Sequence, residues 1–268
     1  MLRQGMFRQA IIKQAMSTQR ILKQAMSWLV LPLILAMTSS SHAAEVLVAV
    51  ANNFNRPLHA MVDSFNQATG HQLVVSTGSS GQIFSQVQNG APYDVFLSAD
   101  QKRPTALVEN ELATEQMTYA EGRVVLWSPI HDLYIDPISY LQQGKFLHIA
   151  LANPKVAPYG VAATQVLEKL DLSDKLKPKV VMGKGLNPTY QYVVTGNAEL
   201  GFLAMSQVIE DGELLPGTIW QIPDSLYEPI KQDAVLLNHG RDNPAAQAFM
   251  TYLRSPQAKA IIQDFGYR

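Results

Sequence analysis

Cysteine is absent from the 268 residues, so the chain has neither a disulfide framework nor a thiolate metal site. No predicted helix contains the HxxxH or HxxE spacing that places zinc ligands on one helix face. A Gly-x-Ser-x-Gly elbow and a phosphate-binding P-loop are also missing. These absences leave little support for a serine hydrolase or a zinc enzyme, although an exported enzyme that uses a cleft between two lobes remains an alternative.

Acidic residues are missing from the first 44 positions, which contain five basic ones: Arg3, Arg8, Lys13, Arg20 and Lys23. An apolar run at 28–37 and small or polar residues at 38–44 follow. This order is typical of a cleaved secretory signal, so we expect a signal peptide over residues 1–44 and a periplasmic protein. A membrane anchor is the alternative, but the apolar run is about half of the ~20 residues needed to cross a bilayer.

The charge of the chain changes when this segment is removed. The whole chain has 21 basic and 22 acidic residues, so the loss of five basic residues leaves a net charge of −6. A nucleic-acid partner would call for a basic surface, and we therefore expect none. The remaining residues suffice for one large α/β domain or two lobes.

Short apolar runs alternate with helical patterns in two successive series. The first series predicts strands at 46–51, 73–76, 94–98 and 123–127 and helices at 57–68, 82–88 and 104–110. The second predicts strands at 147–151, 180–182 and 200–203 and helices at 160–170 and 188–195. A strand at 234–237 and helices at 244–253 and 256–265 end the chain. This alternation favours an α/β fold of two lobes, each a mostly parallel sheet flanked by helices.

Neutral hydrogen-bond donors lie where four of these strands lead into helices. They are Asn52 and Asn53, Ser79 and Ser80, Tyr159, and the segment Leu186-Asn187. Each could be an ordinary helix cap. Four such positions at the carboxyl ends of parallel strands, where ligands of open sheets lie, indicate an anion site instead. Fixed N–H and O–H dipoles bind a dianion without a buried counter-charge and its desolvation cost.

At these positions the sequence resembles the periplasmic molybdate/tungstate-binding proteins of ABC uptake systems. The similar segments are residues 48–54, 79–81, 89–100, 119–128, 153–160 and 255–258. The resemblance covers nearly the whole exported part, and the block 90–100 is its most specific motif. It implies the type II periplasmic-binding-protein fold, in which two lobes joined by two crossing strands close over a ligand in the interlobe cleft. The implied division is 45–127 plus 230–268 for the first lobe and 128–229 for the second.

The resemblance also implies the site and the partners. The oxyanion contacts of the family fall on Asn52, Asn53, Ser80, Tyr159 and Leu186, the last through its backbone N–H alone. The ligand would be molybdate or tungstate, with no cofactor and no directly bound cation. The expected partner is the permease of an ABC molybdate transporter, and the expected state is a monomer.

The chain departs from the family pattern at several of these positions. Asn52 and Asn53 stand where many relatives have a serine or threonine hydroxyl, and Leu186 stands where others have valine. Tyr159 replaces a small residue, whereas Ala204 takes the place of a tyrosine found in one branch. A binder of sulfate, thiosulfate or an organic anion therefore remains the alternative of the same class.

Overall fold

The computed structural model describes residues 43–210 and 212–268. The expected signal peptide lies outside the described residues, apart from Ala43 and Ala44. Within the described residues, no helix has both the length and the apolar character needed to span a bilayer.

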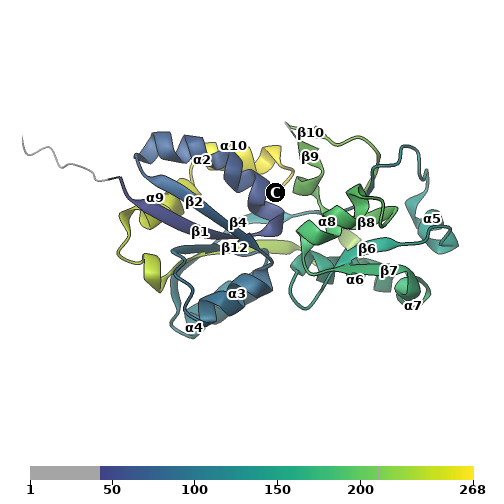
Figure 1. The fold of residues 1–268 in the computed structure, drawn as a ribbon, viewed down its shortest axis with the longest axis horizontal. Helices are drawn as coiled ribbons and strands as arrows, with labels where there is room; N and C mark the ends of the chain where they lie inside the picture. Colours follow the sequence, from purple (N-terminus) through teal and green to yellow (C-terminus); the bar gives the residue numbers. More distant parts are fainter. Residues whose placement is uncertain (1–42, 211) are drawn as a thin grey trace, which may run out of the picture. The chain divides into compact units, whose positions relative to one another are not determined.

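The first sheet has the strand order β2-β1-β3-β12-β4 (Figure 1). Its strands are β1 (Glu45–Ala51), β2 (Gln72–Gly78), β3 (Val95–Leu97), β4 (Ala113–Gly122) and β12 (Ile230–Leu237). Its helices are α2 (Asn55–Thr69), α3 (Ser80–Gln88), α4 (Lys102–Glu109), α9 (Pro244–Tyr252) and α10 (Pro256–Asp264). Since successive side chains of a strand face opposite sides, Val48 packs with α2 and α9, whereas Ala49 packs with α3 and α4. We call this sheet and its helices the first lobe.

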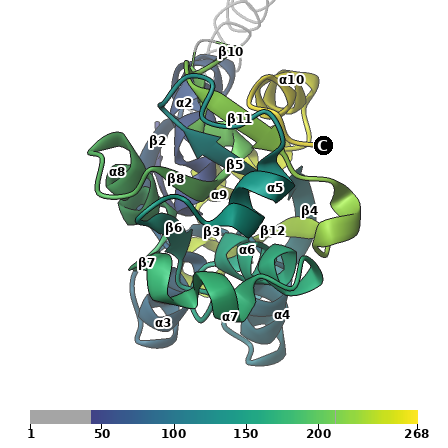
Figure 2. The ribbon, with the colours of Figure 1, turned by 90° about the vertical axis from the view of Figure 1, so that its right-hand side faces the viewer.

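The second sheet has the order β11-β5-β8-β6-β7, whose labels follow one another from top to bottom in Figure 2. Its strands are β5 (Val124–Ser128), β6 (Ile149–Ala152), β7 (Val180–Gly183), β8 (Leu200–Ala204) and β11 (Thr218–Gln221). Its helices are α5 (Pro137–Gln143), α6 (Pro158–Lys169), α7 (Ser173–Leu176) and α8 (Leu186–Val194). Leu151 packs with α6 and Ala150 packs with α8, so these two helices cover opposite faces. We call this sheet and its helices the second lobe.

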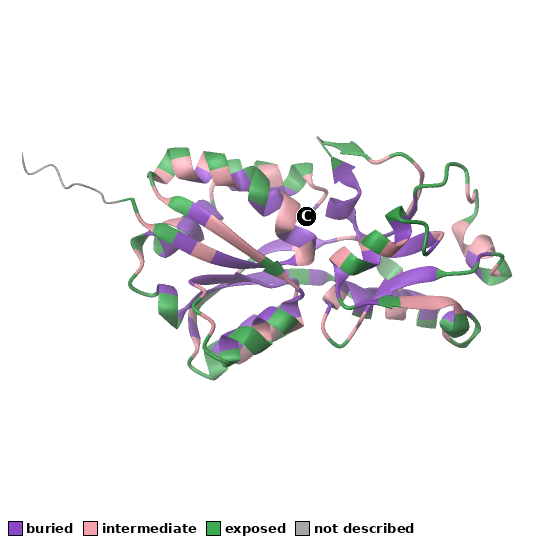
Figure 3. Ribbon diagram, viewed as in Figure 1, coloured by how far each residue is buried: buried purple, intermediate pink, exposed green. Residues whose placement is uncertain are grey.

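Smaller elements complete the two lobes. A short pair, β9 (Ile209–Glu210) and β10 (Glu213–Leu214), follows β8. The 3-10 turns are η1 (Asn52–Phe54), η2 (Lys177–Lys179), η3 (Met205–Gln207), η4 (Asp224–Leu226) and η5 (Asn238–Gly240). The middle strands of both sheets are buried and the outer faces of the helices are exposed, as Figure 3 shows.

The α/β class, the two lobes and the mostly parallel sheets are confirmed, and in each sheet one strand, β12 or β5, runs opposite to the other four. Both sheets are mixed, because β1 pairs in parallel with β2 and β3 while β12 pairs antiparallel with β3 and β4. In the same way, β6 pairs in parallel with β7 and β8, and β5 pairs antiparallel with β8 and β11. The strand expected at 123–127 forms, but it belongs to the second sheet rather than the first. Four strands, β4, β9, β10 and β11, and the helices α5 and α7 were not predicted.

Two strands connect the lobes. β4 ends in the first sheet and β5 begins in the second after a single residue, Arg123, which is earlier than the crossing expected near Ser128. The return from β11 to β12 runs through residues 222–229. At the crossing Gly122 pairs with Ile230 and Glu121 with Lys231, so the two connections lie side by side. The backbone of Arg268 adds hydrogen bonds of 2.8 and 3.0 Å to Glu121.

Candidate functional site

A small cavity lies at the carboxyl ends of parallel strands from both sheets. As placed, the cavity has a volume of about 10 Å³, which is room for about one water molecule. Its lining residues are Ala51, Asn52, Asn53, Ser79, Ser80, Ala99, Ala157, Pro158, Tyr159 and Leu186. The structure therefore brings together all five residues on which the contacts implied by the resemblance fall, three from the first lobe and two from the second, together with Ser79 but without Asn187. Every side chain of this lining is neutral.

Three helices begin at the cavity. Ser80 is the first residue of α3, Tyr159 the second of α6 and Leu186 the first of α8. Backbone N–H groups in the first turn of a helix have no partner within that helix, and they carry the positive end of the helix dipole. Neither α6 nor α8 has a side-chain cap at its N-terminus. The cavity is therefore walled by N–H groups suited to oxygen atoms of an anion.

Two neighbouring serines have different tasks at the start of α3. The Ser79 side chain accepts a hydrogen bond from Gln82 N, and the Gln82 side chain accepts one from Ser79 N, which together form a capping box. Ser80, only 1% exposed, accepts a 2.9 Å hydrogen bond at Oγ from Ala99 N. The Ser80 hydroxyl proton is not used in that bond and can be donated into the cavity. The capping alternative thus holds for Ser79 and not for Ser80.

Asn53 lines the cavity and is at the same time held in a buried polar network. Its Nδ2 donates to Gln232 Oε1 at 2.8 Å and to the Tyr267 hydroxyl at 2.9 Å. Its backbone oxygen accepts from Ser206 Oγ at 2.7 Å and from Tyr267 at 2.8 Å. Asn53 Oδ1 is buried without a hydrogen-bond partner among the described residues. As placed, the Asn53 carboxamide has both of its N–H groups engaged within the protein.

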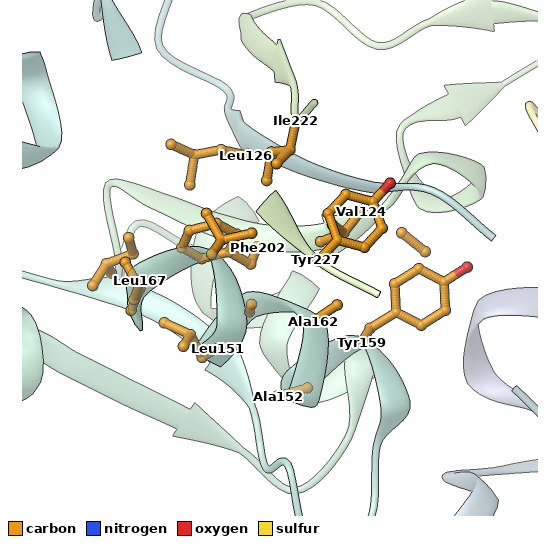
Figure 4. Close-up of a cluster of buried hydrophobic side chains, with 14 of the residues drawn as sticks. Val124, Leu126, Leu151, Ala152, Tyr159, Ala162, Leu167, Phe202, Ile222 and Tyr227 are labelled. Atoms are coloured by element: carbon orange, nitrogen blue, oxygen red, sulfur yellow. The ribbon is translucent and has the colours of Figure 1, made fainter. Parts of the chain in front are cut away.

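Tyr159 extends from the edge of the second-lobe core, and its hydroxyl points away from the apolar cluster (Figure 4). The hydroxyl oxygen accepts a 3.1 Å hydrogen bond from Gln232 Nε2, which belongs to the first lobe. Burial raises the pKa values of Tyr159, Tyr119 and Tyr267 above the usual value for a phenol. We call these three residues the tyrosine cluster. Their hydroxyls stay protonated at neutral pH and remain hydrogen-bond donors.

The lobes touch at two glycines beside the cavity. Gly81 N donates to Val156 O at 3.0 Å, and a Cβ atom at residue 81 would lie 2.9 Å from Val156 Cα. A Cβ atom at Gly185 would lie 2.8 Å from Asn52 Nδ2. A side chain at residue 81 would meet backbone and hold the lobes apart, whereas at residue 185 the Asn52 amide could turn aside. Arg103 Nη2 adds a 3.1 Å hydrogen bond to Lys155 O across the same gap.

Sequence patterns missed the residues that hold the site from behind. Gln232 and Tyr267 contact Asn53 from positions 179 and 214 residues away. The local signal for Gln232 is weak, because Lys231 and Asp233 beside it in the strand 230–237 are polar as well. Within the described part of the chain, no group of three or more His, Asp or Glu side chains could hold a metal ion.

Two α/β lobes joined by two crossing strands, with a neutral donor-lined cavity between them, define a two-lobed solute-binding protein. A family model described as "Bacterial extracellular solute-binding protein" matches residues 46–268. The chain therefore belongs to the bacterial extracellular solute-binding proteins, which are transport proteins rather than enzymes.

Two relatives and one solved structure similar to this chain are molybdate-binding proteins. The chain is 47% identical over 233 residues to the molybdate-binding protein ModA of Azotobacter vinelandii, covering 86% of this chain and 92% of that protein. It is 42% identical over 245 residues to ModA of Rhodobacter capsulatus, covering 88% of this chain and 93% of that protein. The solved structure of the Azotobacter vinelandii periplasmic molybdate-binding protein matches with a TM-score of 0.80 and 39% identity, covering 83% of this chain and 98% of the other.

Proposed function

We propose that this protein captures molybdate, and tungstate with it, in the cavity between its lobes and delivers the ion to the permease of an ABC transporter. The observation that carries the proposal is the donor set, in which three helix N-termini and the Ser80 hydroxyl face one small space without a charged side chain. The names and high identity of the two molybdate-binding relatives support the choice of ion.

The proposed contacts divide between the lobes. Asn52, Asn53 and Ser80 hold the anion from the first lobe. Tyr159 and Leu186 hold it from the second, and Leu186 acts through its backbone N–H. Because these donors are fixed by helices, the size of the cavity selects among tetrahedral oxyanions that differ in radius. Neutral donors avoid the desolvation cost of a buried counter-charge, which suits reversible capture.

The location, the oligomeric state and the lobe boundaries of the protein are part of the same proposal. Residues 1–44 would be the cleaved signal, and the remaining chain would act as a monomer in the periplasm. We assign residues 45–123 and 230–268 to the first lobe and residues 124–229 to the second, following the strand pairing. The two connecting strands would then be the hinge about which the lobes open for the ion to enter.

Calorimetry and thermal unfolding with four oxyanions test the proposal. Molybdate and tungstate should each stabilise the protein, by about 2.7 kcal/mol at a free concentration one hundred times Kd. Sulfate and phosphate at the same concentration should leave the unfolding temperature unchanged. Stabilisation by sulfate or thiosulfate instead of molybdate would favour the alternative ligand class. A lack of response to every oxyanion would refute an anion-binding function.

A further inference from the structure

Gln232 lies directly behind the cavity and contacts a lining residue from each lobe. Its side chain is fully buried and carries no charge. Its Oε1 accepts from Asn53 Nδ2 at 2.8 Å and from the Tyr119 hydroxyl at 3.0 Å, while its Nε2 donates to the Tyr159 hydroxyl at 3.1 Å. Gln232 is not itself part of the cavity lining. It can therefore act on a bound ion only through Asn53 and Tyr159.

The arrangement of these groups is unsuited to an anion in one respect. Asn53 uses both side-chain N–H groups on Gln232 and Tyr267, while its buried Oδ1 has no partner among the described residues. A buried polar atom without a partner costs about 1–3 kcal/mol, and an unpaired acceptor gains nothing from a nearby anion. Turning the Asn53 carboxamide alone would place its Oδ1 against Gln232 Oε1, which is also an acceptor. The two carboxamides can therefore turn only together.

After a joint turn, the contacts among Gln232, Asn53 Oδ1 and the hydroxyls of Tyr119 and Tyr159 are complementary, and Asn53 Nδ2 is left for a ligand. Gln232 Nε2 then faces Asn53 Oδ1 and the Tyr119 hydroxyl, and that hydroxyl still donates to Ser98 O, 3.1 Å away. Gln232 Oε1 then accepts the proton of the Tyr159 hydroxyl. Asn53 Nδ2 is released from Gln232 and Tyr267 and becomes available to a ligand. An amide has donors on one side and an acceptor on the other, so this exchange needs no movement of the backbone.

We propose that Gln232 is a positioning residue of the oxyanion site, which keeps the Asn53 carboxamide turned with Nδ2 toward the bound ion. In this orientation the Tyr159 hydroxyl donates to Gln232, and Tyr159 contacts the ion through its backbone N–H in the first turn of α6. The inference rests on the proposed function. The inference adds a role for the neutral Gln232 carboxamide, which links Asn53 of the first lobe to Tyr159 of the second.

The carboxylate isostere of Gln232 gives a sharp test. In Gln232→Glu an ionised carboxylate only accepts hydrogen bonds, so Asn53 would direct Nδ2 toward residue 232 and its oxygen toward the ion. A protonated carboxyl regains one donor and loses the negative charge. Burial raises the pKa of a carboxyl, and the protonated fraction grows as pH falls. Binding by this variant should therefore recover as pH decreases, whereas the wild-type carboxamide does not titrate.

The experiment measures the molybdate Kd by calorimetry between about pH 8 and pH 6 for the wild type and three variants. Gln232→Met keeps the side-chain length without hydrogen bonds and should bind roughly 5- to 150-fold more weakly at every pH. Gln232→Glu should lose about a hundredfold or more near pH 8 and regain about tenfold or more by pH 6. Gln72→Glu, which adds the same charge at an exposed position of β2, should follow the wild type.

The outcomes separate the two proposals. A wild type that binds no oxyanion overturns the proposed function and this inference together. A binding wild type with an unchanged Gln232→Met variant, or with pH-independent binding by Gln232→Glu, overturns the inference alone. If Gln232→Met does not fold, as judged by its thermal unfolding without ligand, the pH profile of Gln232→Glu decides.

Discussion

Replacing Gly81 with alanine should separate the closing of the lobes from the stability of the fold. Gly81 lies in α3, where its N–H bonds to Val156 O of the second lobe. A Cβ atom at residue 81 would lie 2.9 Å from Val156 Cα, 3.0 Å from its Cβ and 3.1 Å from its Cγ1. The nearest of these atoms belongs to the backbone, which cannot move aside as a flexible side chain would. The added methyl group must therefore push the lobes apart.

The expected loss of molybdate affinity follows from the free-energy cost of overpacking this contact. Inserting a methyl group into a well-packed contact costs about 1–3 kcal/mol, which corresponds to a roughly 5- to 150-fold increase in Kd for molybdate. Within α3 alone, alanine is favoured over glycine by about 1 kcal/mol. The variant should consequently bind more weakly, while its free energy of unfolding without ligand stays equal or rises. The affinity for molybdate should therefore fall, whereas the stability of the unliganded protein should not.

Calorimetry with molybdate and denaturant unfolding without ligand measure the two quantities. Ser85→Ala is the matched control, because Ser85 is an exposed residue of the same helix and its replacement brings no new contact with the second lobe. It should raise helix stability slightly and leave Kd unchanged. Wild-type affinity in Gly81→Ala would show that the lobes do not meet at Val156 when the ion is bound, and the reasoning would fail.

Further predictions concern the hydroxyl donor, the alkaline limit and the interlobe hydrogen bond. Ser80→Ala should weaken molybdate binding by about 1–3 kcal/mol in calorimetry. Ser79→Ala should instead lower the free energy of unfolding by about 1 kcal/mol, because the helix cap is lost. Equal effects of the two variants on Kd would contradict the separate roles of the two serines. The tyrosine cluster has pKa values raised by burial, so its stabilising effect is complete below the unfolded pKa of about 10 and is lost above it. Denaturant titrations should show unfolding free energy falling by up to about 4 kcal/mol per pH unit above pH 10 from these three groups, and a flat curve there would refute their burial. Arg103→Ala removes the bond to Lys155 O and should raise Kd by less than about tenfold, and an unchanged Kd would mean that this bond does not help to hold the lobes together.

The sequence located the residues that line the cavity more completely than it located the strands, for a physical reason. The junctions at Asn52, Ser80 and Tyr159 are local signals, since an apolar run followed by small or polar residues predicts a strand leading into a helix. The apolar sequence of β5 is compatible with a place in either sheet. Only the pairing of β5 with β8 assigns this strand to the second lobe. β4 was missed because its partner β12 lies more than a hundred residues later and a register shift interrupts the pairing.

The contacts behind the cavity could not be predicted from the sequence, for a related reason. Nothing near Gln232 in the chain indicates that its carboxamide bonds to Asn53 and Tyr159, because these partners are 179 and 73 positions away. Sequence spacing predicts contacts within one helix or strand, whereas these contacts depend on how distant strands are ordered in the sheet.

The path of the chain through the two lobes sets an order in which they can assemble. The strands of the second sheet all lie between Val124 and Gln221, whereas the first sheet needs both β1 and β12. Asn53 reaches its final contacts only when Tyr267, 214 positions later, has joined it. Long-range pairings form slowly because the intervening loop must first be closed. During refolding, the second lobe should therefore gain structure before the first, and the capacity to bind an ion should be the last native property to return.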